Sequence, residues 1–345
     1  MRVLVIGQGL AGCLTAWTLR QQGIEVWVTD SQGIEPIPGT TSSTVAAGLI
    51  VPVTGKRYVK TWRWDAFFPT AKETYQAIER QHHLHLWHEM PLLRLLHTTE
   101  EVNNWMLREA EEGYADLLNS SADAGTWGGI LKERPLYGWM QQAARVDLYA
   151  LLSALRGQSA REGRWQTPLT YDEAKAARTA YDHIVFCEGI QGMNNPFFPD
   201  LPWQPAKGEA CLLEIDHDAV LHPTQILKRN IALAPLSNGL FWGGATFEWQ
   251  FVHDRPTAEH QQMIREQIEN MIQRPFHIKQ ALAAVRPATK DRRPFVLQSP
   301  VHPHIWMLNG LGSKGTLMAP TLARELADMI CGRKPEVPIL HGDFV

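Results

Sequence analysis

The sequence predicts an α/β fold: a Rossmann-like domain on a parallel sheet, joined to a second domain built on an antiparallel sheet. Three observations predict it. Residues 3–30 have the pattern of a buried strand, a glycine-rich turn, a helix and a second strand. An apolar strand at 183–187 runs into another glycine turn, as expected of a strand that returns to the same sheet. Residues 208–215, 225–235 and 240–247 alternate well enough to be antiparallel strands.

The opening stretch has the pattern of a dinucleotide-binding turn. Residues 3–6 are a continuous apolar run rich in β-branched side chains, as a strand buried on both faces requires. The sequence GQGLAG follows at residues 7–12. In such a turn Gly7 permits the sharp bend, Gly9 lets the backbone approach a pyrophosphate, and Gly12 lets helix and strand pack closely.

The residues after this turn strengthen the interpretation. A helical pattern ends at Gly23, where a C-terminal glycine is typical, and a strand at 24–29 leads to Asp30. A carboxylate about 20 residues after the glycine turn accepts hydrogen bonds from an adenosine ribose. The helix N-terminus offers free N–H groups and a positive dipole end to phosphates. The alternative is an ordinary glycine-rich βα turn, but this context favours dinucleotide binding.

Composition limits the remaining possibilities. With 345 residues, 44% of them hydrophobic, the chain is long enough for about two domains. A net charge of −3 gives no basic excess for nucleic acid, and no apolar run approaches the ~18 residues of a membrane span. The four cysteines are far apart and suit a reducing compartment, so we expect a cytoplasmic protein without disulfides. We expect no metal site, since the histidines at 82–88 have no acid or cysteine at a fixed ligand spacing.

The middle of the chain contains fewer strong signals. Residues 10–13 look like a lipoprotein cleavage box, but cleavage there would destroy the first strand, so we expect no signal peptide. Residues 39–48 are small and hydroxyl-rich and suit backbone that passes close to a flat ligand, or else a plain surface loop. The remaining expected elements are helices at 65–86, 102–112, 148–155 and 261–272, strands at 90–97 and 165–171, a capping box at 98–101, a strand-turn near 128–129, and a proline-rich domain crossing at 196–205.

The last part of the chain repeats the strand, glycine loop and helix order. A strand at 305–308 runs into NGLGSKG at 309–315, and a helix follows at 316–331. The sequence VRPATKDRRP at 285–294 precedes this unit. Glycines at such a loop let the backbone approach a planar group without Cβ clashes, and the helix N-terminus presents its positive dipole end to that group.

Four motifs in this order resemble the D-amino-acid-oxidase-like family of FAD-dependent oxidoreductases, which includes glycine oxidase and sarcosine oxidase. They are GQGLAG with Asp30, SSTVAAG at 42–48, the strand leading to Gly189, and VRPATKDRRP followed by NGLGSKG. The resemblance covers nearly the whole chain. It implies an FAD-binding domain of residues 1–80, 143–205 and 286–345, with an antiparallel-sheet substrate domain of residues 81–142 and 206–285 inserted twice.

The resemblance also implies roles for individual residues. Arg286 matches the arginine that pairs with the substrate carboxylate in glycine oxidase, and Lys314 falls near another basic residue, so these two are the candidate catalytic residues. A domain-bridging salt bridge for Arg286 and an exposed surface position for Lys314 are the alternatives. Sarcosine oxidase holds its flavin through a cysteine just before the position of Arg286, and this region has no cysteine here, so FAD should be bound non-covalently. The implied cofactor-binding residues are Gly7, Gly9, Leu10, Ala11, Gly12, Asp30, Ser42, Ser43, Ala47, Gly48, Leu169, Gly189, Gly312, Ser313, Lys314, Gly315 and Thr316.

The leading hypothesis is an enzyme that oxidises the C–N bond of an amine or amino acid. Hydride would pass from the substrate to flavin N5, the imine would hydrolyse, and oxygen or another acceptor would reoxidise the flavin. Two alternatives remain: an oxidase acting on a modified tRNA base, and a non-catalytic FAD-binding scaffold. A nicotinamide dehydrogenase is disfavoured, because such an enzyme would not need the C-terminal glycine loop and helix. The sequence leaves the substrate, the electron acceptor and the oligomeric state open.

Overall fold

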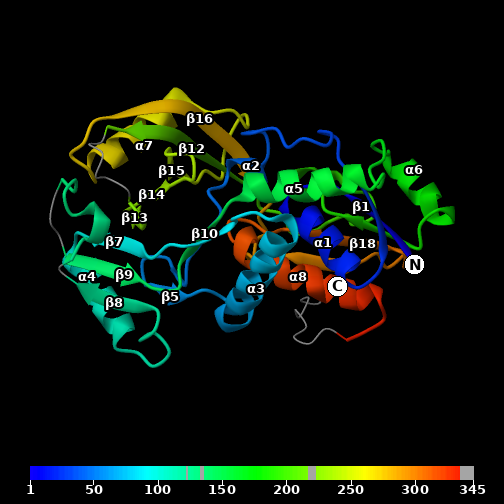
Figure 1. The fold of residues 1–345 in the computed structure, drawn as a ribbon, viewed down its shortest axis with the longest axis horizontal. Coiled ribbons are helices and arrows are strands. Elements are labelled where there is room, and N and C mark those ends of the chain that lie inside the picture. The colour runs from blue at the N-terminus through cyan, green and yellow to red at the C-terminus, as the bar shows by residue number, and fades with distance from the viewer. Residues whose placement is uncertain (122, 133–135, 217–222, 335–345) are drawn as a thin grey trace.

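The computed structural model describes residues 1–121, 123–132, 136–216 and 223–334. Figure 1 shows two halves: a five-stranded sheet with its helices, and an eight-stranded sheet flanked by α4 and α7. The five-stranded sheet has the order β17-β18-β11-β1-β2. Its strands are β1 (Arg2–Ile6), β2 (Glu25–Thr29), β11 (His183–Phe186), β17 (Phe295–Gln298) and β18 (Ile305–Asn309).

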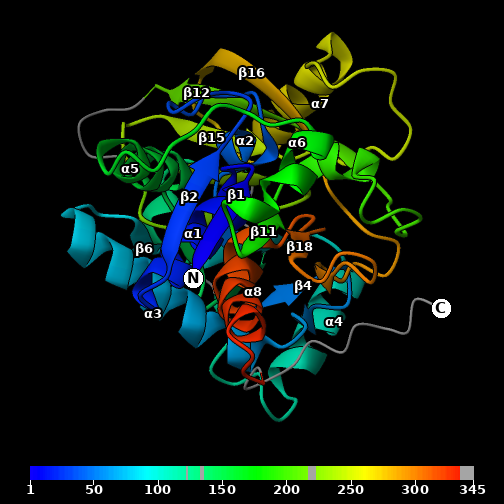
Figure 2. The same cartoon turned by 90° about the vertical axis from the view of Figure 1, so that its right-hand side faces the viewer.

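The strand directions in this sheet determine where the site lies. Strand β1 pairs in parallel with both β2 and β11, and β11 pairs in parallel with β18, whereas β17 is antiparallel. The apolar run of β1 is buried on both faces, as the sequence predicts. Val3 and Val5 join the core that contains α1 and α8, and Leu4 joins a separate core on the other face. Figure 2 shows these helices beside the strands.

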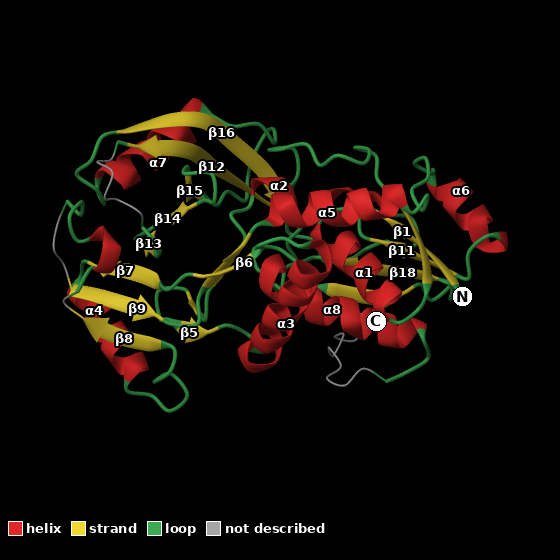
Figure 3. Ribbon diagram, in the orientation of Figure 1, coloured by secondary structure: helices red, strands yellow, loops and turns green. Residues whose placement is uncertain are grey.

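The second half is a curved mixed sheet of order β16-β12-β15-β14-β13-β7-β9-β8 (Figure 3). Its pairs are antiparallel except for β7 and β13, which run in parallel. Strands from two separate parts of the chain therefore share one sheet. They are β7 (Leu92–Leu96), β8 (Leu118–Ser121), β9 (Leu136–Met140), β12 (Ala206–Ile215), β13 (Ile226–Lys228), β14 (Ala232–Pro235), β15 (Phe241–Gly244) and β16 (Phe276–Arg286).

Shorter strands and the helices complete the fold. Strands β3 (Leu49–Ile50), β10 (Ala144–Val146) and β6 (Trp87–Glu89) form a small sheet, and β4 (Val53–Thr54) pairs with β5 (Val59–Lys60). None of the helices in the described ranges is long and apolar enough to cross a membrane. The helices are α1 (Leu10–Gln21), α2 (Ser42–Val45), α3 (Trp64–His82), α4 (Thr99–Glu109), α5 (Leu148–Arg161), α6 (Tyr171–Ala176), α7 (Ala258–Glu269) and α8 (Gly315–Ile330), with 3-10 turns η1 (Gly125–Trp127), η2 (Ala177–Thr179) and η3 (Gly189–Asn194).

The fold class is confirmed, and several local predictions hold with it. Thr98 and Glu101 form the expected capping box of α4, and Asp147 caps α5 through the N–H of Ala150. The returning strand is β11, which pairs with β1 from Val3↔His183 to Ile6↔Phe186. The terminal strand and helix are β18 and α8.

Other local predictions are wrong. Residues 165–171 form no strand: only Trp165 bridges to β2, and α6 begins at Tyr171. The helix expected at 65–86 ends at His82, because His83 adopts a left-handed conformation and Glu79 accepts the backbone N–H groups that follow. The turn expected near 128–129 is present at 128–130, but the residues before it, 125–127, form a 3-10 helix and not a strand. The long strand β16 has no counterpart among the predicted elements.

Candidate functional site

The glycine turns singled out in the sequence meet at one edge of the five-stranded sheet. Because β1, β2, β11 and β18 are parallel, their carboxyl ends lie at the same edge. Gly7 follows β1, Asp30 follows β2, Gly189 follows β11, and the loop 310–314 follows β18. This is the position where open α/β sheets bind their ligands.

The first turn is shaped for a phosphate group. Gly7 has a φ of +90°, and a Cβ there would lie 2.4 Å from the carbonyl oxygen of Cys187, while a Cβ on Gly12 would lie 1.7 Å from the carbonyl oxygen of Gly7. Gly9 caps α1 without a side-chain hydrogen bond. Among the described residues, the backbone N–H groups of Ala11 and Gly12 meet no acceptor. These free donors at a helix N-terminus fit a pyrophosphate.

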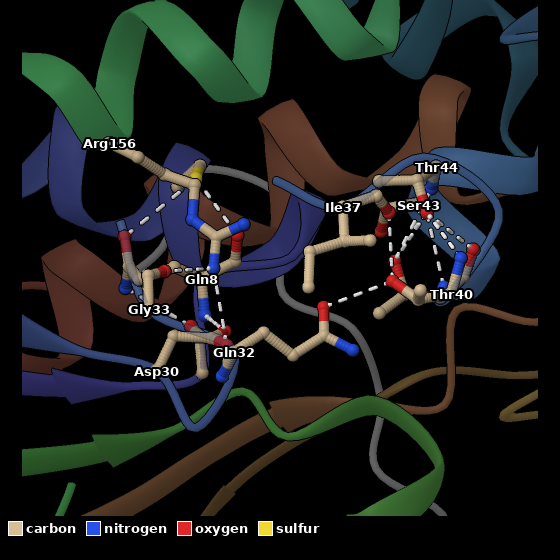
Figure 4. A network of polar contacts seen from close by, with 12 residues as sticks. Gln8, Asp30, Gln32, Gly33, Ile37, Thr40, Ser43, Thr44 and Arg156 are labelled. Carbon is tan, nitrogen blue, oxygen red and sulfur yellow. Dashed lines mark hydrogen bonds and ion pairs between the residues drawn. The ribbon is translucent and has the colours of Figure 1, made fainter. Parts of the chain in front are cut away.

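The carboxylate of Asp30 is held by three donors (Figure 4). Its Oδ2 accepts the backbone N–H of Gln8 at 2.6 Å, and its Oδ1 accepts that of Gln32 at 2.8 Å. Arg156 from α5 forms an ion pair with Oδ1 at 3.1 Å and donates to the carbonyl of Gly33 at 2.8 Å. The Arg156 side chain is only 3% exposed. The acid expected at the ribose is therefore fixed by a buried arginine that local sequence patterns do not reveal.

We expect Arg156→Met to weaken FAD binding about 10-fold, because losing the cation leaves the Asp30 carboxylate less firmly oriented and its charge uncompensated. Titration of the apoprotein with FAD, followed by flavin fluorescence, measures the change. Arg161→Met, on an exposed position of the same helix, is the matched control and should bind FAD as the unaltered protein does. Equal affinities for the two variants would contradict this role of Arg156.

The segment before β3 links the first turn to the second half of the molecule. The Ser43 hydroxyl accepts the backbone N–H of Leu10 at 3.0 Å, so its own hydrogen is left to donate. The Ser42 hydroxyl instead donates to the carbonyl of Val285 at 2.7 Å. Ala47 is buried, and a Cβ on Gly48, whose φ is +73°, would lie 2.0 Å from a backbone carbonyl oxygen.

The turns after β11 and β18 are tied to each other. The Asn309 side chain donates to the carbonyl of Gly189 at 2.9 Å, and Gly189 has a φ of +56°. Within the loop after β18, the N–H of Gly312 donates to the carbonyl of Pro287 at 3.1 Å, which places this loop beside the end of β16. Leu169 lies in the loop before α6, half-buried against the core on the other face of the sheet.

The start of α8 presents one lysine toward the second half. Ser313 is exposed, and Gly315 and Thr316 begin the helix, where Tyr75 donates its hydroxyl to the carbonyl of Thr316 at 2.8 Å. Lys314 is half-buried, and its Nζ donates to the Thr61 hydroxyl at 3.2 Å. Burial and the nearby charge of Lys228 lower the pKa of Lys314 to about 8.

Arg286 lies at the carboxyl end of β16, beside this loop. Its guanidinium donates to the carbonyls of Lys207 and Thr246, each at 3.2 Å, and lies 5.1 Å from the ring centroid of Phe247. Burial lowers the pKa of Arg286. In the part of the chain that the structure describes, no carboxylate forms an ion pair with it. The cation is held by backbone and an aromatic ring, which leaves donors for an anionic ligand.

The structure thus brings together most of the residues that the sequence selected. The three glycine turns, Asp30, Ser43, Lys314 and Arg286 converge at or beside the sheet edge, while Leu169 lies on the neighbouring loop. Trp242 lies on β15 and donates to the carbonyl of Val45, whereas Phe247 and Trp249 lie in the loop beyond that strand. Within the described ranges, His, Cys, Asp and Glu side chains form no group of three or more that could hold a metal ion.

Four parallel strands with a glycine turn after β1, an acid after β2 and a second glycine loop before α8 have the pattern of a dinucleotide-binding protein. Residues 2–329 match the DAO family, described as FAD dependent oxidoreductase. The chain belongs to this family, its cofactor is FAD, and the resemblance seen in the sequence is confirmed.

Individual relatives agree with the family. The glycine oxidase of Pseudomonas putida is 23% identical, over 97% of this chain and 95% of its own length. The tRNA 5-methylaminomethyl-2-thiouridine biosynthesis bifunctional protein MnmC of Maricaulis maris is 29% identical over 96% of this chain, and the chain spans only 52% of that relative. The crystal structure of glycine oxidase from Geobacillus kaustophilus matches 98% of this chain and 97% of its own with a TM-score of 0.78 at 15% identity.

Proposed function

We propose that this FAD-dependent oxidoreductase oxidises the C–N bond of a small amine or amino acid. The observation that carries the proposal is Arg286, a half-buried guanidinium with no carboxylate partner in the described residues, beside the glycine loop of α8. An arginine fork suits the carboxylate of an amino acid. Similarity to glycine oxidases over nearly the whole chain supports the same class of substrate.

In this proposal the cofactor is held by the residues selected from the sequence. Bound FAD supplies the hydride acceptor at N5, and oxygen or another acceptor reoxidises it. The free N–H groups of Ala11 and Gly12 bind the pyrophosphate, Asp30 binds the ribose, and Leu169 contacts the adenine through its backbone. The remaining contacts, along the phosphates, the ribityl chain and the flavin pyrimidine, fall to Gly7, Gly9, Leu10, Ser42, Ser43, Ala47, Gly48, Gly189, Gly312, Ser313, Lys314, Gly315 and Thr316.

The protein's own part in catalysis is then orientation and electrostatics. Arg286 would fix the substrate carboxylate so that the Cα–H bond has one orientation, which makes the reaction effectively unimolecular. Lys314 and the N-terminus of α8 would stabilise negative charge near the glycine loop. Imine hydrolysis needs only water, so no general base is assigned.

Two further points belong to the same proposal. The parts 1–80, 143–205 and 286–345 make up the FAD-binding domain, and 81–142 and 206–285 the substrate domain. Residues 122, 133–135, 217–222 and 335–345 of these parts lie outside the described residues. FAD is bound non-covalently in a cytoplasmic protein, in keeping with the free cysteines Cys13, Cys187, Cys211 and Cys331.

An anaerobic absorbance scan tests the proposed function. The purified protein with FAD is mixed with a panel of amines and amino acids, and we expect one class to bleach the flavin band. The MnmC relatives favour a second candidate, an oxidase of a modified tRNA base, so tRNA is included in the panel. Bleaching by tRNA alone would favour that candidate, and a flavin that no compound reduces would favour a scaffold.

A further inference from the structure

A second cationic group lies across the site from Arg286. Lys228 ends β13, in register with Ala232 of β14 and with Arg94 of β7. Residues directly opposite each other in a sheet share a face. Ala232 belongs to the core that contains α1 and α8, whereas Leu227 belongs to the core on the other face of the sheet. Lys228 therefore projects from the face turned toward the FAD-binding half.

The charges of Lys228 and Lys314 act on each other although the residues come from different halves of the molecule. Lys314 is fixed by the Thr61 hydroxyl at 3.2 Å. Burial and the charge of Arg94 lower the pKa of Lys228 to about 8, and the charge of Lys228 in turn lowers that of Lys314. Across the ranges that the structure describes, neither ammonium has a carboxylate within 4.0 Å. Two half-buried cations without a counter-ion are costly unless an anion joins them.

The row of residues that crosses the sheet face from Lys228 toward Arg286 is made of small residues, with the Trp242 indole lying against the glycine in its middle. From Lys228 the row of paired residues runs through Ala232 and Gly244 to Ala210. Gly208, two residues before Ala210 on the same face, lies under the Arg286 guanidinium, which a Cβ at Gly208 would approach to 2.1 Å. From β12 to β13 there are three strand spacings, or about 14 Å between backbones. The long side chains of Arg286 and Lys228 reach into this interval from its two ends.

We propose that Lys228 and Lys314 form an anion subsite, and that the physiological substrate is an amine with two carboxylates, one bound by Arg286 and the other by the lysine pair. This inference rests on the proposed function and deepens it by naming the substrate class. Lys228 is then the residue that determines specificity for the second carboxylate.

Matched N-substituted glycines test the inference. The rate constant of anaerobic flavin reduction divided by the dissociation constant is measured for N-(2-carboxyethyl)glycine against N-propylglycine, and for N-(3-carboxypropyl)glycine against N-butylglycine. We expect the dicarboxylates to be favoured about 10- to 100-fold, as a charge-assisted hydrogen bond to a desolvated lysine allows. In Lys228→Met this preference should fall to about one while the monocarboxylate values stay unchanged, and Lys228→Arg should retain part of it.

The control and a binding measurement complete the test. Lys279→Met removes an exposed lysine of β16 that is paired with Glu214 and should keep the full preference. Binding of glutarate against butyrate, followed by perturbation of the flavin spectrum, reports on the subsite without turnover. No preference in the unaltered protein, or a preference that survives in Lys228→Met, would overturn the inference. If neither these glycines nor any amine or amino acid of the panel reduces the flavin, the proposed function fails, and the glutarate-to-butyrate ratio still decides whether the subsite exists.

Discussion

We expect Arg286→Met to slow flavin reduction by amino acids about 1,000-fold while FAD stays bound. The guanidinium lies beside the α8 loop, and its loss removes the proposed bidentate, charge-assisted contact with the substrate carboxylate. A 1,000-fold change corresponds to about 4 kcal/mol of transition-state stabilisation, within reach of two such hydrogen bonds. Stopped-flow absorbance under anaerobic conditions gives the rate constant, and the flavin content of the purified variant shows whether FAD is retained.

Two variants separate binding from structure at this position. Arg286→Lys keeps the charge but loses the planar fork, so its rate should lie between those of Met and Arg. Lys290→Met removes an exposed cation from the same segment and should behave like the unaltered protein. Arg286 also donates to two backbone carbonyls, so thermal unfolding of each variant is measured alongside. An Arg286→Met protein that is stable and reduces its flavin at the normal rate would exclude the carboxylate-binding role.

The second large effect is expected at Gly12. A Cβ added there would lie 1.7 Å from the carbonyl oxygen of Gly7 and 2.9 Å from its carbonyl carbon, both of them backbone atoms that cannot rotate away. We expect Gly12→Ala to destabilise the protein by about 3 kcal/mol and to weaken FAD binding more than 100-fold, because α1 must move away from β1. Denaturant unfolding and FAD titration measure the two effects.

Gly157 provides the matched control on another helix. A Cβ there would meet only the Arg161 guanidinium, the flexible end of a side chain, at 3.2 Å. Since alanine favours a helix over glycine by about 1 kcal/mol, Gly157→Ala should be neutral or stabilising. If Gly12→Ala were as well tolerated as Gly157→Ala, the close packing of α1 on the first turn would not be what positions the N–H groups for the pyrophosphate.

The fold was predictable where local chemistry is strong. The glycine turn after β1, the capping box at Thr98 and the strand that returns to β1 each carry their own signal. Strand β16 does not, since its QALAAV segment is helix-prone and becomes a strand only because β12 pairs along its whole length. At 165–171 the apolar pattern is misleading, because Pro168 cannot donate to a strand ladder and Thr170 caps α6.

The site likewise contains residues that could be predicted from the sequence and residues that could not. Its glycines and Asp30 could be selected because backbone conformation and spacing demand them. Arg156 could not, because it reaches Asp30 from a helix distant in the sequence and no spacing links the two residues. Lys228 could not either, because in the sequence it is one polar residue in a short strand. The direction of its side chain follows from its register with Ala232, and the neighbouring charge of Lys314 is apparent only in the folded structure.

The interleaved order of the five-stranded sheet has a consequence for biosynthesis. Strand β1 is made first, yet its partner β11 begins at His183 and the next strand, β18, begins at Ile305. At ribosomal rates, roughly 10 to 35 s separate the synthesis of β1 from that of β11. During this time β1 has at most one of its two neighbours, β2, and its apolar residues lack their cover. Sheet closure thus waits for distant parts of the chain, which makes folding slow and the nascent chain dependent on protection from aggregation.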